Sequence, residues 1–468
     1  MMTRSLIMAV AAAAGVFALE ARTFEVAAWR GETVAARVPD FAEVGQAPDG
    51  IKVRLGVLRS VKYAPAVESL QRLEVYDRVQ WKTPRMSLKG PRVVEVSVPA
   101  DAKPGVYACG HMNIRVVDRV LPPAKAWKYY LDLWQHPWAT ARMAGVKPFS
   151  KEHYDAMRPV YELLASAGQK TITVSILDLP WDHQCFDAYH SMVDDADFRT
   201  FDEYVQFCLD CGLGPDISCY SLCPWTLGKE IDADELERRW GAFLDRFAKH
   251  LKEKGWFANT LMAMDERAPE DVRKVVDFVH RHALGLRISM AGNRKPSDFK
   301  GIDIDVYAQS LGHVSDDFLR DVPARRAKGF VTTQYVCCWP SRPNTFMDST
   351  AGEAFWLGAA PAFLGLDGFL RWAWNSWPQD PCADATFGGW RAGDTFLCYP
   401  GGEPSWRFLE LRNGIIAAEK VRLLREAGLL KDELVKVSAL YKVMEAIDGK
   451  SDFPAIRYET LSVVNKGR

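Results

Sequence analysis

The sequence predicts an α/β protein in which a closed (β/α)8, TIM-like barrel follows an N-terminal β-sandwich. Residues 22–120 contain short alternating runs separated by Pro, Gly and Asp turns, with no helical pattern between them. Residues 125–428 instead alternate apolar strand-length runs with amphipathic helix-length segments. Eight such units match the count of a closed barrel, and a glycine-rich phosphate fingerprint that would favour an open doubly wound sheet is missing.

Residues 1–21 have the pattern of a secretory signal peptide. Arg4 supplies the positive charge, Leu6 to Leu19 form a short apolar stretch, and small residues follow it. The stretch is too short for a comfortable membrane span, and no second run reaches spanning length. We therefore expect an exported protein, secreted or periplasmic, without a membrane span.

The predicted sandwich and barrel are joined at 121–127, where two prolines favour extended backbone. The expected sandwich strands are 24–29, 33–38, 51–58, 93–98 and 112–117. The expected barrel strands are 129–134, 170–177, 215–222, 260–266, 286–292, 302–309, 330–338 and 368–375. The helices between and after them are 151–167, 201–209, 232–251, 269–283, 316–328, 350–366 and 404–427.

Two segments fit the barrel pattern poorly. The helix after the fifth strand is short or missing, and Pro323 interrupts the sixth helix. Residues 429–468 read as a polar helical tail with no recognisable chemistry.

Composition excludes several classes of function. The formal charge of −1 indicates no nucleic-acid partner. Cys208 and Cys211 have CxxC spacing, but the further well-spaced ligands of a zinc site are missing. We expect no metal and no cofactor, and we expect the ten cysteines to be buried thiols or to form one or two disulfides.

One strand ends unusually. The apolar run from Thr260 to Met264 stops at two adjacent carboxylates, Asp265 and Glu266. The other Asp-Glu pairs, at 202, 234 and 432, lie in polar helical segments. Because unpaired charge is costly to bury, such a pair belongs where a core strand reaches a polar cleft. In a barrel this is the C-terminal mouth, where active sites lie.

Polar and aromatic residues follow the other predicted strands. Carboxylates combined with tryptophans suggest carbohydrate hydrolysis. Trp372 and Trp374 alternate and should share one face, whereas Asp394, in a glycine-flanked loop, should cap a turn. For each tyrosine and tryptophan, burial in the core is the alternative. The candidate substrate-binding residues are Asp132, Asp178, Tyr307, Tyr335, Trp339, Trp372, Trp374 and Asn375.

Adjacency restricts what the two carboxylates can do. Neighbouring strand residues point to opposite faces, so both can share a pocket only where the strand ends or twists. A nucleophile and an acid would stand roughly 5 Å apart across the scissile bond, on different strands. Glu266 as acid and Asp265 holding the substrate fit adjacency better, and burial with repulsion should raise one pKa. The alternative is a salt-bridged pair with Arg267 or Arg294.

Several motifs together resemble glycoside hydrolase family 123 and proteins with the uncharacterised C-terminal domain numbered 4091. They are Tyr335 with the following CCWPSRPNTFMD, then GLDGFLRWAWNSWPQDP, WRAGDTFLCYPG and ELRNGIIAAEKVRLLRE, and the resemblance covers about 125–428. It implies a retaining exo-hydrolase of terminal β-linked N-acetylgalactosamine, whose substrate supplies its own 2-acetamido nucleophile. Asp265 would orient that group, and Glu266 would act as acid and then base.

The resemblance has a departure, and other functions stay open. Arg267 stands where the family usually continues with Pro, which leaves the sugar preference open. One alternative is a glycosidase for another sugar that pairs Glu266 with Asp132 or Asp178. Another is a catalytically silent carbohydrate-binding protein. In every case the expected partner is a glycan or glycoconjugate, and the sequence does not predict the oligomeric state.

Overall fold

A computed structural model describes residues 23–40, 42–48, 50–84, 86–178, 186–193, 197–222, 232–430 and 451–466. The predicted signal peptide and most of the predicted tail lie outside these residues. The chain forms two compact units. The smaller contains the described residues up to Val57 together with Trp81–Leu121, and the larger contains Leu58–Gln80 and Pro122–Lys466.

Two sheets share one core in the smaller unit. Buried residues from both sheets, including Val26, Val94 and Ile114, form a single apolar cluster, as expected for a sandwich. The segment Leu58–Gln80, which contains the end of β3 and most of β4, belongs to the larger unit. The three-stranded sheet has the order β1 (Phe24–Arg30), β7 (Met112–Val120), β6 (Gly105–Cys109). The four-stranded sheet has the order β2 (Thr33–Val38), β5 (Arg92–Ser97), β3 (Lys52–Tyr63), β4 (Leu73–Trp81).

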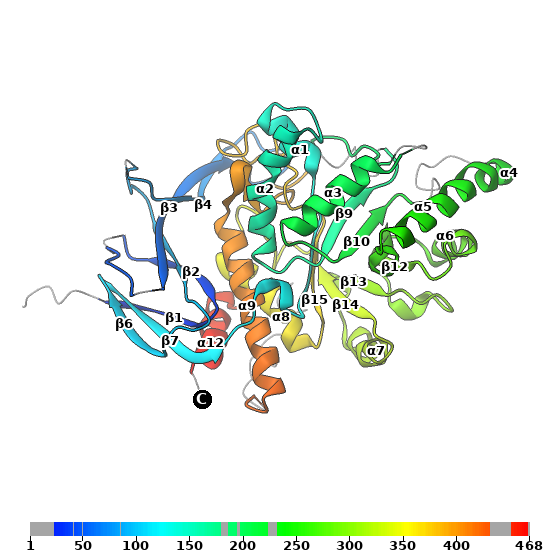
Figure 1. The fold of residues 1–468 in the computed structure, drawn as a ribbon. Helices are drawn as coiled ribbons and strands as arrows, with labels where there is room; N and C mark the ends of the chain where they lie inside the picture. Colours follow the sequence, from blue (N-terminus) through cyan, green and yellow to red (C-terminus); the bar gives the residue numbers. More distant parts are fainter. Residues whose placement is uncertain are drawn as a thin grey trace, which may run out of the picture. The chain divides into compact units, whose positions relative to one another are not determined.

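The larger unit is built on eight parallel strands, which confirms the predicted (β/α)8 barrel (Figure 1). The barrel closes because β8 pairs with β15 and also contacts the segment before β9 through the Leu131–Gln169 bridge. The order is β8 (Tyr130–Leu133), β15 (Gly368–Arg371), β14 (Val331–Tyr335), β13 (Val306–Ser310), β12 (Arg287–Gly292), β11 (Thr260–Asp265), β10 (Asp216–Tyr220), β9 (Thr171–Ser175).

Helices lie outside the strands (Figure 1). The short α1 was not predicted, because its eight residues show little periodicity, although Pro137 begins it in a favourable position. After β12 only the 3-10 turn Pro296–Asp298 occurs, and α7 continues through Pro323. The helices are α1 (Pro137–Ala144), α2 (Lys151–Ala165), α3 (Arg199–Asp210), α4 (Ala233–Glu235), α5 (Ala242–Glu253), α6 (Pro269–His282), α7 (Asp316–Ala327), α8 (Ala351–Leu364), α9 (Trp406–Glu426) and α12 (Phe453–Asn465).

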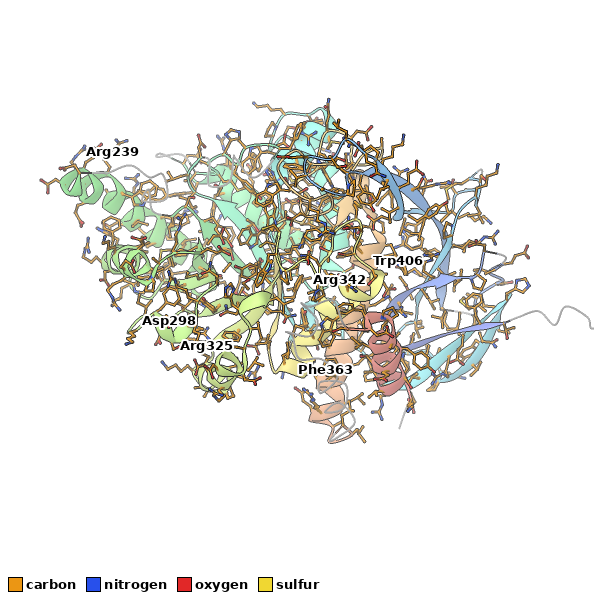
Figure 2. The ribbon with its side chains drawn as sticks, turned by 180° about the vertical axis from the view of Figure 1, so that it is seen from behind. Arg239, Asp298, Arg325, Arg342, Phe363 and Trp406 are labelled. Atoms are coloured by element: carbon orange, nitrogen blue, oxygen red, sulfur yellow. The ribbon has the colours of Figure 1, made fainter. Side chains whose placement is uncertain are left out.

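Helices α8 and α9 cross in close contact. A Cβ on Gly414 would lie 2.0 Å from the Phe355 carbonyl oxygen, so only glycine permits this approach. Figure 2 labels Phe363 near the end of α8 and Trp406 at the start of α9. Among the described residues, no helix combines the length and apolar character needed to cross a membrane.

Within the larger unit, a buried ion pair connects Asp77 of β4 with Arg407 of α9. The Arg407 guanidinium lies 3.0 Å from the Asp77 carboxylate, and both side chains are almost fully buried. Tyr399 donates its hydroxyl to the same carboxylate at 2.7 Å. The guanidinium also donates to the carbonyls of Thr345, Gly393 and Phe396. Hydrogen bonds to every side of the cation offset part of the desolvation that burial imposes.

Asp77→Ala is expected to lower the free energy of unfolding by about 3–5 kcal/mol, because it leaves Arg407 buried without its counter-ion. Urea denaturation followed by circular dichroism would measure the loss. Asp317→Ala, which removes an exposed partner of Lys295, serves as the control and should leave the denaturation midpoint nearly unchanged. Equal midpoints for both variants would contradict a stabilising role for the buried pair.

Candidate active site

Asp265 and Glu266 lie where β11 ends at the C-terminal edge of the barrel. Asp265 is the last strand residue, and the Glu266 amide still donates to the Ala291 carbonyl of β12 at 2.8 Å. Glu266 then departs from strand geometry, with a φ of 42° that non-glycine residues seldom adopt. This turn interrupts the alternation of side chains, so Asp265 and Glu266 need not point to opposite faces of the sheet.

Two side chains from neighbouring strand ends hold Glu266. The hydroxyl of Tyr335, the last residue of β14, donates to one carboxylate oxygen of Glu266. The amide of Asn293, just after β12, donates to the other oxygen at 3.3 Å. Asn293 was expected at the end of the fifth barrel strand, but it was not among the candidate substrate-binding residues. Glu266 stays exposed, so it remains open to a ligand.

Both carboxylates affect the pKa of Tyr335. Burial, then Glu266 and, more weakly, Asp265 raise the pKa of the Tyr335 phenol well above its usual value. Burial and, next, the charge of Glu266 raise the pKa of Asp265 to about 7. The charge of Arg267 lowers that pKa in part. Asp265 therefore holds a proton through part of the neutral pH range, where an ordinary aspartate is ionised.

Tyr307 is buried and its hydroxyl is occupied by backbone. It donates to the Arg294 carbonyl at 2.6 Å, two residues beyond the end of β12. Tyr307 thereby fixes the segment that carries Asn293. The structure records local satisfaction of this hydroxyl, which was the alternative to a role in substrate binding.

Asp132 lies below the barrel mouth. It is almost fully buried and accepts the hydroxyl of Thr171, the first residue of β9, whereas Asp265 ends its strand. Burial raises the pKa of Asp132 to about 7. Burial, then the charges of Asp132 and Asp265, raise the pKa of the Tyr220 phenol well above its usual value. Its ring packs on Trp134 with a centroid distance of 4.7 Å.

Asp178 follows β9 but acts on a neighbouring loop. Its carboxylate accepts the Ser191 amide at 2.6 Å, and its side chain is 62% exposed. His190 approaches the same carboxylate at 4.0 Å. The structure thus connects Asp178 to residues 190–191 and records no bond from it to Asp265 or Glu266.

The expectation that Trp372 and Trp374 share one face was wrong. Strand β15 ends at Arg371, so strand alternation does not extend to either tryptophan. Trp372 is partly exposed and packs on Trp390 with a centroid distance of 5.3 Å. Trp374 is fully buried and packs on Phe408 of α9 at 4.7 Å.

Asp394 was expected to cap a turn, but it is the centre of a buried network. It forms an ion pair with Arg371 at 2.8 Å, with both side chains inaccessible to solvent. It also accepts the Trp372 indole N–H at 3.0 Å, which orients that ring. Arg371 further donates to the Val336 carbonyl and to Asn344. The pair therefore connects the ends of β14 and β15 with the loop around Asp394.

The Asn375 side chain forms hydrogen bonds with both backbone polar groups of His136. Its amide oxygen accepts the His136 N–H at 2.8 Å, and its amide nitrogen donates to the His136 carbonyl at 3.0 Å and to Thr140. Since the side chain is fully buried, these hydrogen bonds hold the end of β8 and the start of α1.

Trp339 has an exposed aromatic ring. It is 43% exposed and lies after β14, close to the turn that follows β13. A Cβ on Gly312 would lie 1.5 Å from the indole ring, so Trp339 rests directly on a glycine backbone. The His313 ring lies 5.5 Å away. An exposed, supported indole is suited to stacking against an apolar ligand face.

No group of three or more His, Cys, Asp or Glu side chains in the part of the chain that the structure describes could hold a metal ion. Cys208 and Cys211 are buried free thiols, and the other cysteines in the described ranges are also unpaired.

Comparisons with known proteins identify the family and support the fold. The family model described as the catalytic domain of glycoside hydrolase 123 matches residues 134–424, more than half of the chain. A family 123 glycoside hydrolase from Clostridium perfringens, solved in work on glycolipid glycan hydrolysis, has the same fold. Its TM-score is 0.79 at 21% identity, with 95% of this chain and 94% of that chain covered.

Other matches are more distant. An endoglucanase from Clostridium longisporum has a TM-score of 0.37 at 11% identity, covering 64% of this chain and 99% of that one. A family 5 mannosidase from Rhizomucor miehei has a TM-score of 0.33 at 12% identity, covering 63% and 94%. No curated protein matches. The resemblance to proteins with domain 4091 stays a prediction, whereas the match over 134–424 shows that the chain belongs to glycoside hydrolase family 123 and is a glycosidase acting on glycans.

Proposed function

We propose that the protein removes terminal β-linked N-acetylgalactosamine from glycoconjugates, with retention of configuration and with the substrate's 2-acetamido group as nucleophile. The observation that carries the proposal is the adjacent pair Asp265-Glu266, which ends β11 and acts on one phenol, that of Tyr335. Two adjacent carboxylates cannot stand on opposite sides of a scissile bond. Substrate assistance needs no second carboxylate there, because the nucleophile arrives with the sugar.

The proposed reaction divides the work between the two carboxylates. Asp265 accepts the acetamido N–H, so the acetamido carbonyl oxygen becomes more electron-rich and attacks C1. Glu266 donates a proton to the leaving oxygen as the glycosidic bond breaks, and a cyclic oxazolinium ion forms. Glu266, now ionised, removes a proton from water, which attacks C1 and opens the ring with net retention.

Substrate binding supplies the correct protonation state. In the free enzyme, Asp265 holds a proton near neutral pH because its pKa is raised to about 7, and Glu266 accepts the Tyr335 hydroxyl. In the proposed complex, the acetamido N–H would stabilise ionised Asp265. The proton would then move to Glu266, where the leaving oxygen needs it. In this proposal the acetamido group both provides the nucleophile and causes Glu266 to become protonated.

The other pairings of carboxylates receive no support. Asp132 is buried at the level of Thr171, and Asp178 is bonded to the Ser191 amide. Neither has a recorded bond to Glu266 or to the residues that hold it. We also propose that the chain is exported, on the pattern of residues 1–21. A glycoconjugate in the surroundings of the cell would then be its substrate.

Three chromogenic glycosides separate the candidate functions. We expect turnover of the β-N-acetylgalactosaminide, weaker turnover of the β-N-acetylglucosaminide, and none of the β-galactoside, which lacks the nucleophile. Steady-state release of the aryl group would be measured. Hydrolysis of the plain galactoside would exclude substrate assistance, and sugar binding without turnover of any glycoside would favour a silent binding protein.

Substitution of each carboxylate tests its role. Glu266→Gln should lower kcat/KM about 10²–10⁴-fold for poor leaving groups and much less for a dinitrophenyl leaving group, which needs little protonation. Asp265→Asn should slow hydrolysis for every leaving group. Glu203→Gln, in an Asp-Glu pair on α3, is the matched control and should retain activity. Wild-type rates for Glu266→Gln would refute the assignment.

The pH dependence follows from the raised pKa of Asp265. Above pH 7 Asp265 loses the proton that it would pass to Glu266, because the pKa of Asp265 is raised to about 7 by burial and by Glu266. For a poor leaving group, kcat/KM should therefore fall as pH rises above about 7. For an activated leaving group it should not fall, since ionised Asp265 suffices. Asp265→Asn should remove this limb, and its persistence in that variant would assign it to another group.

A further inference from the structure

Two adjacent cysteines follow the strand that holds the catalytic acid. Cys337 and Cys338 come directly after Tyr335 and Val336, at the end of β14. Their sulfur atoms lie 3.9 Å apart. Cys338 is exposed and Cys337 is partly exposed. The proposed reaction uses neither thiol.

The backbone that carries the two thiols is held from the barrel side. Arg371 donates to the Val336 carbonyl at 3.3 Å, and Asn344 donates to the Cys337 carbonyl at 3.0 Å. The Cys337 amide donates to the Trp339 carbonyl at 3.3 Å. The sulfur atoms are therefore kept close to each other, and they can be joined if side-chain rotation is accompanied by a change in the backbone torsions between the two residues.

We propose that Cys337 and Cys338 form a vicinal dithiol that is oxidised reversibly to a disulfide and thereby changes substrate binding at the barrel mouth. The geometry that supports this proposal is the pair of neighbouring sulfurs, one of them exposed, between Tyr335 and the exposed ring of Trp339. The site would react with small disulfides and would chelate trivalent arsenicals, which need two neighbouring thiols.

The oxidation is a thiol–disulfide exchange with a small disulfide such as oxidised glutathione. The exposed Cys338 thiolate attacks one sulfur of the oxidant, whose S–S bond breaks and releases one thiolate. Cys337 loses its proton and attacks the Cys338 sulfur of the mixed disulfide, which releases the second thiolate. Two protein thiols are oxidised by two electrons, the small disulfide is reduced to two thiols, and the two protons go to the released thiolates.

The order of attack follows from exposure. Burial raises the pKa of the Cys337 thiol to about 12, so the solvent-exposed Cys338 reacts first. Neighbouring α-carbons are about 3.8 Å apart, closer than in ordinary disulfides. The product is therefore strained and easily reduced, as regulatory disulfides are. The proposed export would expose the pair to oxidants.

The disulfide would act on the site through its chain neighbours. Ring closure changes the torsions between Cys337 and Cys338, and Trp339 is the next residue. The Trp339 ring rests on Gly312 with no room to spare, so a shift of its backbone must displace the ring. An aromatic platform that moves should change KM more than kcat, since Glu266 is held separately by Tyr335 and Asn293.

The test uses the full-length protein equilibrated in glutathione buffers of increasing oxidised fraction. Free thiols are trapped with N-ethylmaleimide, and peptides are mapped by mass spectrometry. We expect the peptide with both residues to lose two hydrogen atoms and to regain them with dithiothreitol. Reduced protein should bind phenylarsine oxide at this pair, and oxidised protein should not. KM for the aryl glycoside should rise about two- to tenfold on oxidation and recover on reduction.

Two variants sharpen the result. Cys338→Ser should lose the internal disulfide, the arsenical binding at this pair and the response of KM to oxidant. Cys382→Ser removes another partly exposed thiol of the larger unit and should respond as the unaltered protein does.

Three results would overturn the proposal. The first is full alkylation of both thiols at the most oxidising ratio, and the second is a glutathione adduct without the internal disulfide. The third, a disulfide that leaves KM unchanged, would overturn the link to the active site. Thiol mapping needs no turnover, so it stays readable even if the proposed sugar specificity fails.

Discussion

The repulsion between two neighbouring carboxylates at the end of one buried strand is the constraint on which the proposed active site depends. Asp265 and Glu266 need not point to opposite faces of the sheet, because the chain leaves strand geometry at Glu266, at a cost on the order of 1 kcal/mol. The surroundings must hold that turn in place. Tyr335 and Asn293 do so from two neighbouring strands, and the Glu266 amide keeps its bond to β12.

Around this turn, the barrel supports its mouth with buried polar groups. The Arg371–Asp394 pair connects the segments after β14 and β15 and orients Trp372. The Asn375 amide holds both backbone groups of His136. Each is fully buried and bonded, so each fixes the position of a loop. Residues that resembled substrate ligands in the sequence are thus part of the frame that positions the exposed ones.

Sequence patterns predicted the strands of the barrel well, because a buried parallel strand is a short apolar run with clear ends. Helix α1 and strand β6 were missed because short segments carry little periodicity. The nine-residue β4 was missed because only Asp77 and Val79 of it are buried, so it has no apolar run. Asp265 and Glu266 were found because charge at the end of an apolar run is unusual. Side-chain direction was harder to predict. Nothing in the sequence shows that β15 stops at Arg371, and the alternation expected for Trp372 and Trp374 stops there too.

The division of the chain into units has a consequence for modularity. Strands β3 and β4 leave the smaller unit at Val57 and return to it at Trp81, so the segment between them belongs to the barrel unit. That segment carries Asp77, the counter-ion of Arg407. A truncation at the proline linker would therefore remove a piece of the barrel together with the sandwich. The larger unit is discontinuous in sequence, so a cut at the linker does not separate the two units into complete domains.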